Sequence, residues 1–222
     1  FLFIPYGPVW AENINVTTQI EANFALLSEI KKHGCKYGYD FLRVSPFIAD
    51  SPEAKKRFKD DRFQSAPMHM LAEHTWLLDV RPAEETLLAN MEKNHRNLVR
   101  RCQKEGVTVT FSSNDEAIAD FNRLHDITAA RHKFHRFSAD YIRREFEAFA
   151  PAGQAVIGRA YLADGTLDSA AIFMFYGTMS AYRHGASLMT DKKVPTSYLL
   201  QWEAIRLARE RGMHWHNFCG IA

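Results

Sequence analysis

The chain has 222 residues, 46% hydrophobic and 13% aromatic, which is enough to bury one large core or two modest ones. Its 28 Lys and Arg residues nearly balance its 26 Asp and Glu residues, and the formal net charge of +2 excludes a global field that would drive nonspecific nucleic-acid binding. The three cysteines are an odd number without CxxC spacing, which favours a reducing compartment. The longest apolar runs fall far short of the roughly 20 residues of a membrane helix, so we expect a soluble, cytoplasmic protein.

The first third of the chain alternates strands and helices. A short strand opens it, and a helix is predicted over 18–33, where apolar residues repeat at helical spacing after a capping box and Gly34 is placed to end the helix. A buried strand over 39–44 follows. Ser51 then opens a charged segment that extends to Phe63.

The middle of the chain contains the clearest helical pattern. A strand is predicted over 75–80, and Pro82 opens a single long helix that ends before Gly106. A strand over 107–111 leads away from it.

The last part combines helices with a sheet. Ser113 and Ser138 are predicted to cap two successive helices. Three apolar runs within 155–186 are separated by turn residues, which predicts an antiparallel meander at the centre of the sheet. A helix that begins near Pro195 and a strand over 215–218 close the chain, so the fold class is mixed α/β.

Four stretches, in order, carry a resemblance to a known family. They are FIPYGPVW (3–10) with FLRVSPF (41–47), LLDVRPAEETLLANMEKNHRNLVRRCQKEGVTV (77–109), RHKFHRFSADY (131–141), and YRHGAS (182–187) continued through PTSYLLQWEAI to HNFCGI (216–221). Together they resemble the Fem family of peptidoglycan bridge-forming aminoacyltransferases, which have two acetyltransferase-like domains in tandem. The resemblance implies an α/β, mixed-sheet GNAT-type fold. Residues 1–74 would be the C-terminal part of the first domain and residues 75–222 a C-terminally incomplete second domain.

The chain also departs from the family pattern. Ser45 stands where the family often has an acidic residue before the Pro of an Arg-x-x-Pro strand. A Phe-Lys pair and a Lys that handle substrate in the family fall outside the sequence, and Gly106 leads directly to a strand, without the helical arm of some members. Because the sequence starts within a predicted strand and stops just after another, we expect it to be a piece of a longer enzyme.

The resemblance implies transfer of an amino acid from aminoacyl-tRNA to the stem-peptide or bridge amine of a lipid-linked or UDP-linked muropeptide, in cell-wall biogenesis. It implies no metal, no bound cofactor and no DNA partner. The location that it implies is the cytoplasm, including peripheral contact with the inner face of the plasma membrane. Aminolysis of an ester needs an oriented carbonyl and a free amine rather than a covalent enzyme intermediate, so no catalytic residue is assigned.

Two pairs of residues are candidates for substrate binding. Arg136 and Tyr141 match the family's motif to within one residue and would hold a diphosphate or sugar, since guanidinium binds phosphate bidentately. The alternative without a binding role is that Arg136 is a solvated cation in a loop and Tyr141 packs in the core. Tyr182 and His184 are predicted on one face of a strand that leads into Gly185, where they would line a peptide channel. A strand aromatic is as readily explained by packing.

A basic stripe is predicted on the long helix and would contact tRNA. It consists of Lys93, Arg96, Arg100 and Lys104. A solvated helical face is the competing explanation.

Two further patterns point to no site. Five residues of zinc-ligand type have no spacing that fits a metal centre; they are His132, His135, His214, His216 and Cys219. Arg209, Gly212 and His214 approach a coenzyme A phosphate loop but follow a helix instead of preceding one.

Two alternatives remain open. One is an acyl-CoA-dependent N-acyltransferase on the same fold, which a cleft splayed between two strands would favour. The other is a catalytically incomplete binding module, suggested by Ser45 and by the absence of the family's terminal regions from this sequence.

Overall fold

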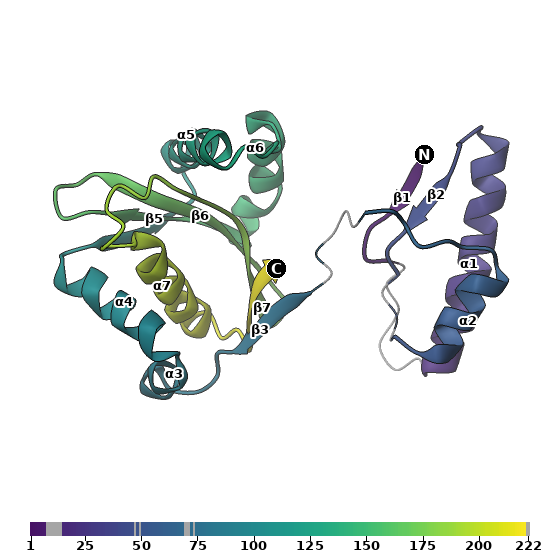
Figure 1. The fold of residues 1–222 in the computed structure, drawn as a ribbon, viewed down its shortest axis with the longest axis horizontal. Coiled ribbons are helices and arrows are strands. Elements are labelled where there is room, and N and C mark those ends of the chain that lie inside the picture. The colour runs from purple at the N-terminus through teal and green to yellow at the C-terminus, as the bar shows by residue number, and fades with distance from the viewer. Residues whose placement is uncertain (8–14, 47, 49, 69–71, 73, 221–222) are drawn as a thin grey trace. The chain divides into compact units, whose positions relative to one another are not determined.

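A computed structural model describes residues 1–7, 15–46, 48, 50–68, 72 and 74–220. The chain divides into two compact units, Phe1–Glu73 and His74–Ala222 (Figure 1). Residues 8–10, Phe47 and Ile221 of the Fem-like motifs lie outside the described residues. No helix in the described part of the chain is long and apolar enough to cross a membrane.

The first unit is a two-stranded parallel sheet with two helices. Strand β1 (Leu2–Ile4) pairs with β2 (Leu42–Val44), and they are connected through α1 (Val16–Lys36); α2 (Pro52–Asp60) follows. Its core consists of Ile20, Phe24, Leu27 and Ala54.

The ends of α1 differ from the prediction. Asn15, not a capping box at Thr18, caps the helix by accepting a hydrogen bond from the Thr18 amide. The helix passes Gly34 and ends at Lys36, because Gly34 keeps a helical conformation and Gly38 provides the positive φ (69°) beyond the end. Ser51 does cap α2, as predicted.

The second unit is built on a six-stranded sheet of order β3-β8-β7-β6-β5-β4. The strands are β3 (Thr75–Asp79), β4 (Thr108–Ser112), β5 (Ala155–Tyr161), β6 (Leu167–Tyr176), β7 (Met179–Ser187) and β8 (Trp215–Gly220). The central meander is confirmed: β5, β6 and β7 pair antiparallel, whereas β7 and β8 pair parallel.

Helices cover both faces of this sheet (Figure 1). Helix α5 (Asp115–His132) and α6 (Ala139–Phe149) share one hydrophobic cluster with it, and α3 (Glu84–Asn90), α4 (Lys93–Lys104) and α7 (Thr196–Glu210) share another. A short 3-10 helix spans Ala150–Ala152. Ser138 caps α6 as predicted, but Asn114, not Ser113, caps α5. The mixed α/β fold class is confirmed.

The predicted single helix from Pro82 to Gly106 is wrong, because the chain breaks between α3 and α4. Met91 is extended (ψ 141°), and the guanidinium of Arg96 donates hydrogen bonds to the carbonyls of Leu88, Ala89 and Met91. Arg96 thus satisfies carbonyls that α3 would otherwise leave without partners at its end.

Gly158 lets α7 approach the middle of the sheet. A Cβ at this position would lie 2.7 Å from Leu200 of α7 and 2.8 Å from Phe111 of β4. Only glycine therefore fits the observed packing.

Candidate functional site

A β-bulge in β7 decides where the candidate residues point. Phe173 of β6 is paired with Tyr182, but its neighbour Ile172 is paired with His184, so Arg183 is an extra residue in β7. An extra residue reverses the alternation of side chains beyond it. Tyr182 consequently faces the α7 side with Phe173, whereas His184 faces α5 and α6. The prediction that Tyr182 and His184 share one face is wrong.

The Tyr182 side chain also occupies the space beside Gly185. A Cβ on Gly185 would lie 1.5 Å from the Tyr182 hydroxyl oxygen, so the phenol already lies against this backbone. Burial raises the pKa of the phenol. The gap that the glycine leaves is therefore filled by the protein's own tyrosine.

A carboxylate from α6 joins the two residues at the bulge. Glu145 Oε2 lies 2.9 Å from His184 Nε2, and Glu145 Oε1 accepts hydrogen bonds from Nε (3.1 Å) and Nη2 (2.7 Å) of Arg183. The Glu145 side chain is 16% exposed and that of His184 10%, whereas that of Arg183 is 39% exposed. We name these three residues the Glu145 cluster.

The Glu145 cluster keeps its carboxylate ionised. Burial by itself would raise the pKa of Glu145, but the hydrogen bonds from His184 and Arg183 outweigh it and lower the pKa to about 2. Glu145 is thus a fixed negative charge at neutral pH, suited to orienting an imidazole rather than to accepting a proton.

Arg136 is held against α5. Its Nε lies 2.6 Å from Asp126 Oδ1, its Nη1 donates to Asn122 Oδ1 (3.0 Å) and lies 3.3 Å from His125 Nδ1, and its side chain is 11% exposed. Burial first, and then the charge of Arg136, lower the pKa of His125 to about 4. The solvated-loop interpretation of Arg136 is therefore wrong, and two of its three nitrogens already have partners.

Tyr141 lies on the exposed side of α6. It is 44% exposed and stacks on Phe137, with ring centroids 4.7 Å apart, and the Phe137 ring lies 6.2 Å from that of His184. Within the described residues, no hydrogen bond or ring contact joins Tyr141 to Arg136. The structure brings Tyr141 towards His184 through Phe137, and the core interpretation of Tyr141 is wrong.

The strands β7 and β8 separate just before Tyr182, Arg183 and His184 of β7. Their parallel ladder consists of Met179, Ser180 and Ala181 of β7 against residues 215–217, and β7 continues to Ser187 without further pairs to β8. Cys219 of β8 has a left-handed φ of 61° beyond this point. Burial raises the pKa of its thiol, which argues against a reactive thiolate.

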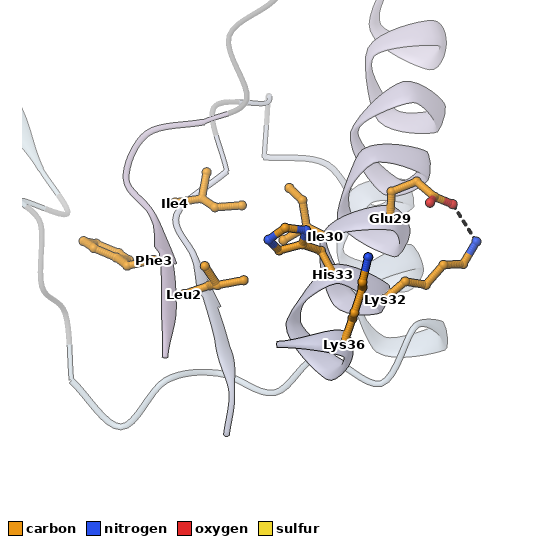
Figure 2. Close-up of a pocket in the computed structure, with 8 residues that line it drawn as sticks. All are labelled: Leu2, Phe3, Ile4, Glu29, Ile30, Lys32, His33 and Lys36. Carbon is orange, nitrogen blue, oxygen red and sulfur yellow. Dashed lines mark hydrogen bonds and ion pairs between the residues drawn. The ribbon is translucent and has the colours of Figure 1, made fainter. Parts of the chain in front are cut away.

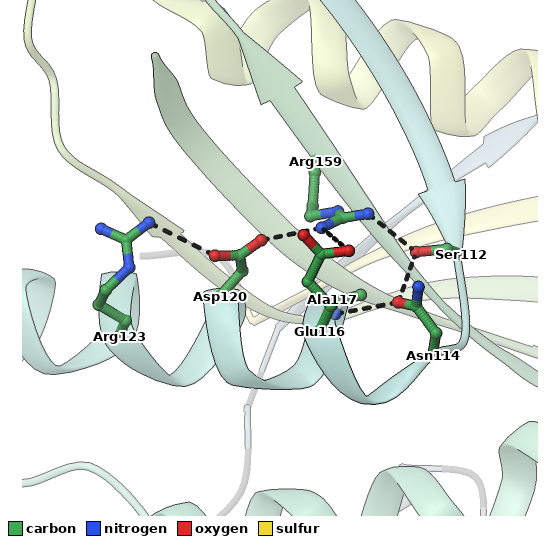
Figure 3. Close-up of polar contacts among 7 residues, drawn as sticks. All are labelled: Ser112, Asn114, Glu116, Ala117, Asp120, Arg123 and Arg159. Atoms are coloured by element: carbon green, nitrogen blue, oxygen red, sulfur yellow. Dashed lines mark hydrogen bonds and ion pairs between the residues drawn. The ribbon is translucent and has the colours of Figure 1, made fainter. Parts of the chain in front are cut away.

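A network around Arg159 fixes α5 on the sheet (Figure 3). Arg159 of β5 is 8% exposed, and its Nη1 lies 2.8 Å from Asp120 Oδ2 and 3.7 Å from Glu116 Oε2. Its Nη2 donates to Ser112 Oγ at 3.3 Å. Because Asp120 and Glu116 belong to α5, the network sets the position of the helix that carries His125.

The basic stripe is only partly available to a ligand. Lys93, Arg100 and Lys104 are exposed on α4, whereas Arg96 is partly buried and its guanidinium is bound to the carbonyls at the end of α3. Arg96 therefore belongs to the folding of this region.

A pocket lies in the first unit, away from the candidate residues in sequence. It has a volume of about 690 Å³ and lies between β1 and α1, where Leu2 and Ile4 of β1 point towards Ile30 and His33 of α1 (Figure 2). Among the residues that the structure describes, no group of three or more His, Cys, Asp or Glu side chains is arranged to hold a metal ion.

Residues 65–164 match the model of the FemAB family. The fold is similar to the crystal structure of FemX, with a TM-score of 0.79 and 19% sequence identity over 99% of this chain and 71% of FemX. The predicted resemblance to the Fem family is confirmed. A comparison with curated protein sequences finds no match.

Two further structures resemble this Fem-like chain. L-PGS from Bacillus licheniformis has a TM-score of 0.57 and 14% identity over 91% of this chain and 59% of L-PGS. A tandem GNAT protein from the clavulanic acid biosynthesis pathway has a TM-score of 0.50 and 14% identity over 78% of this chain and 51% of that protein. The GNAT-type fold is thus confirmed, and the Fem-like chain spans about half to seven tenths of these proteins.

Sequence reasoning did not identify Glu145 or Arg183. One signal was available for Glu145. Ile142 and Phe146 are on the buried side of α6, and helical spacing places Glu145 on the same side, towards the sheet. No signal in the sequence marks the bulge that turns Arg183 and His184 towards it.

Proposed function

We propose that the protein carrying this chain is an aminoacyltransferase of cell-wall or lipid modification. More narrowly, it moves an amino acid from aminoacyl-tRNA to the stem-peptide or bridge amine of a lipid-linked or UDP-linked muropeptide. The observation that carries this proposal is the FemAB match over residues 65–164, supported by a FemX-like fold along nearly the whole chain.

The charges of the site suit such substrates. Arg183 is the cation of the Glu145 cluster that reaches solvent, and Tyr141 is an exposed phenol on the neighbouring helix. A guanidinium and a phenol are suitable donors for a diphosphate or sugar. We therefore assign to Arg183 and Tyr141 the anion-binding role expected of Arg136 and Tyr141, and we retain Tyr182 and His184 as residues that border the acceptor peptide.

The reaction exchanges an ester for an amide. The amine nitrogen attacks the ester carbonyl, and the ribose oxygen of the tRNA leaves. Positioned reactants and hydrogen-bond donors near the developing oxyanion supply much of the rate acceleration, so no bound cofactor is required.

The test is mass spectrometry of acceptors incubated with the full-length protein, charged tRNA and a complete set of amino acids, with and without ribonuclease. A muropeptide precursor and phosphatidylglycerol vesicles serve as separate acceptors. A ribonuclease-sensitive gain of one amino-acid mass on the muropeptide is expected. A gain only on the lipid would overturn the narrower proposal, and no gain on either would overturn the whole.

The separation of β7 and β8 favours a second candidate, an acyl-CoA-dependent N-acyltransferase. The parallel ladder stops at Ala181, and the fold also matches a tandem GNAT protein. The same assay with acyl-CoA in place of charged tRNA distinguishes the two. Acylation that depends on acyl-CoA and survives ribonuclease would favour this candidate, and a module without activity would show neither reaction.

A further inference from the structure

The Glu145 cluster fixes the orientation of the His184 imidazole, which is partly exposed to solvent. The Arg183 bulge turns two consecutive residues, Arg183 and His184, towards one carboxylate. Arg183 binds Oε1 of Glu145 through two nitrogens, and the other oxygen, Oε2, is left for His184. A carboxylate that is fixed in this way holds its histidine partner in one ring orientation.

The hydrogen bond to Glu145 also determines the tautomer. Because Glu145 is ionised, Nε2 of His184 donates its hydrogen to Oε2, so in the neutral imidazole Nδ1 carries the lone pair. Within the described residues, Nδ1 has no hydrogen-bond partner, yet it is not among the polar atoms sealed from solvent without one. His184 therefore presents a nitrogen that can accept a proton.

Aromatic rings and a second histidine surround the His184 ring. Phe121 and His125 of α5 lie 6.4 and 6.1 Å from its ring centroid, and Phe137 borders it from the loop before α6. His125 stays neutral because burial and the charge of Arg136 lower its pKa to about 4.

The charges facing His184 are thus Glu145 from α6, Arg183 from β7, and Arg136 through His125. Attachment of α6 to the sheet does not by itself explain why His184 is part of the cluster. A purely structural ion pair between Glu145 and Arg183 would be complete without His184.

We propose that His184 is the catalytic base of the aminoacyl transfer and that Glu145 is its positioning residue. This inference rests on the proposed function. As the amine nitrogen forms its bond to the ester carbonyl carbon, Nδ1 of His184 takes one proton from that nitrogen. When the carbon–oxygen bond to the ribose breaks, the imidazolium returns the proton to the departing oxygen, so His184 ends neutral. Glu145 stays ionised throughout and stabilises the transient imidazolium.

The first test compares kcat/KM of the full-length protein and the variant His184→Gln, with charged tRNA and the muropeptide. Glutamine keeps a donor for Glu145 but cannot accept a proton, so we expect a loss of about 100-fold or more, as for removal of a general base. The matched control is Glu84→Gln, which removes one of the two carboxylate partners of Arg206 on the other face of the sheet. This control should retain wild-type kcat/KM.

Two further readouts separate catalysis from a structural role. In His184→Ala, added imidazole should restore part of the lost rate in proportion to its concentration, whereas the wild type should not respond. The pH profile of kcat/KM should lose one ascending limb in His184→Gln and keep the limb set by the acceptor amine. Glu145→Gln should lower kcat by a larger factor than it raises KM for the muropeptide, because the variant weakens the hold on both His184 and Arg183.

The outcomes are distinct. A wild-type protein with no transfer activity would overturn the proposed function itself. An active wild type whose His184→Gln variant keeps full activity, or keeps both pH limbs without imidazole rescue, would overturn the role of His184 alone. If the His184 variants do not fold, unchanged kcat in Glu145→Gln would overturn the proposal.

Discussion

Glu145→Gln should destabilise the second unit in a way that disappears in acid. The pKa of Glu145 falls from an ordinary 4.5 to about 2 in the folded protein. At about 1.36 kcal/mol for each pKa unit, this fall corresponds to about 3 kcal/mol of stabilisation at neutral pH. The side chain is 16% exposed, so solvent screens little of this interaction.

The sign of the pH dependence follows from the lowered pKa. A carboxylate that is favoured in the folded state stabilises it fully above pH 4.5, and the stabilisation is lost as the pH falls towards about 2. The difference in unfolding free energy between wild type and Glu145→Gln should therefore be about 3 kcal/mol at pH 7 and shrink steadily below pH 4.5.

Urea denaturation between pH 3 and pH 7 measures this difference. Tryptophan fluorescence is a suitable signal, because three of the four tryptophans, Trp76, Trp202 and Trp215, lie in the second unit. Glu147→Gln is the control: its carboxylate is 56% exposed beside Arg143 on the same helix and should contribute less than about 1 kcal/mol. A Glu145→Gln penalty that stays constant from pH 7 to pH 3 would refute the reasoning.

Three other predictions concern His125, Gly158 and α4. The pKa of His125 is lowered from 6.5 to about 4, so wild-type stability should be full above pH 6.5 and fall towards pH 4, and His125→Gln should flatten that dependence in the same denaturation series. Gly158→Ala should cost about 1–3 kcal/mol by overpacking against Leu200, and a melting temperature equal to wild type would contradict this. Reversing three exposed charges on α4 should weaken tRNA binding and lower its salt dependence in a filter-binding assay, and an unchanged salt slope would place tRNA elsewhere. These charges are Lys93, Arg100 and Lys104.

Local signals in the sequence predicted much of the fold. Ser51 and Ser138 cap their helices as expected, since a cap depends on residues three positions apart. The meander was equally clear, because its turn residues separate three apolar runs. The prediction that α1 ends before Gly34 was wrong, since a glycine can also continue a helix, and α1 extends to Lys36.

Features that depend on distant contacts were not predictable. The break between α3 and α4 is stabilised by Arg96, which reaches carbonyls of the preceding helix. The faces of Tyr182 and His184 depend on a bulge that no residue type announces. The sequence thus indicated His184 as a candidate but could not indicate that Glu145 holds it.

The most direct test of the proposed aminoacyl transfer is a single-turnover reaction with tRNA charged with a labelled amino acid. The full-length protein should move the label from the alkali-labile ester of the tRNA to an alkali-stable amide on the muropeptide, and ribonuclease treatment beforehand should abolish the transfer. Label that stays on the tRNA, or that is released only as free amino acid, would contradict the proposed function.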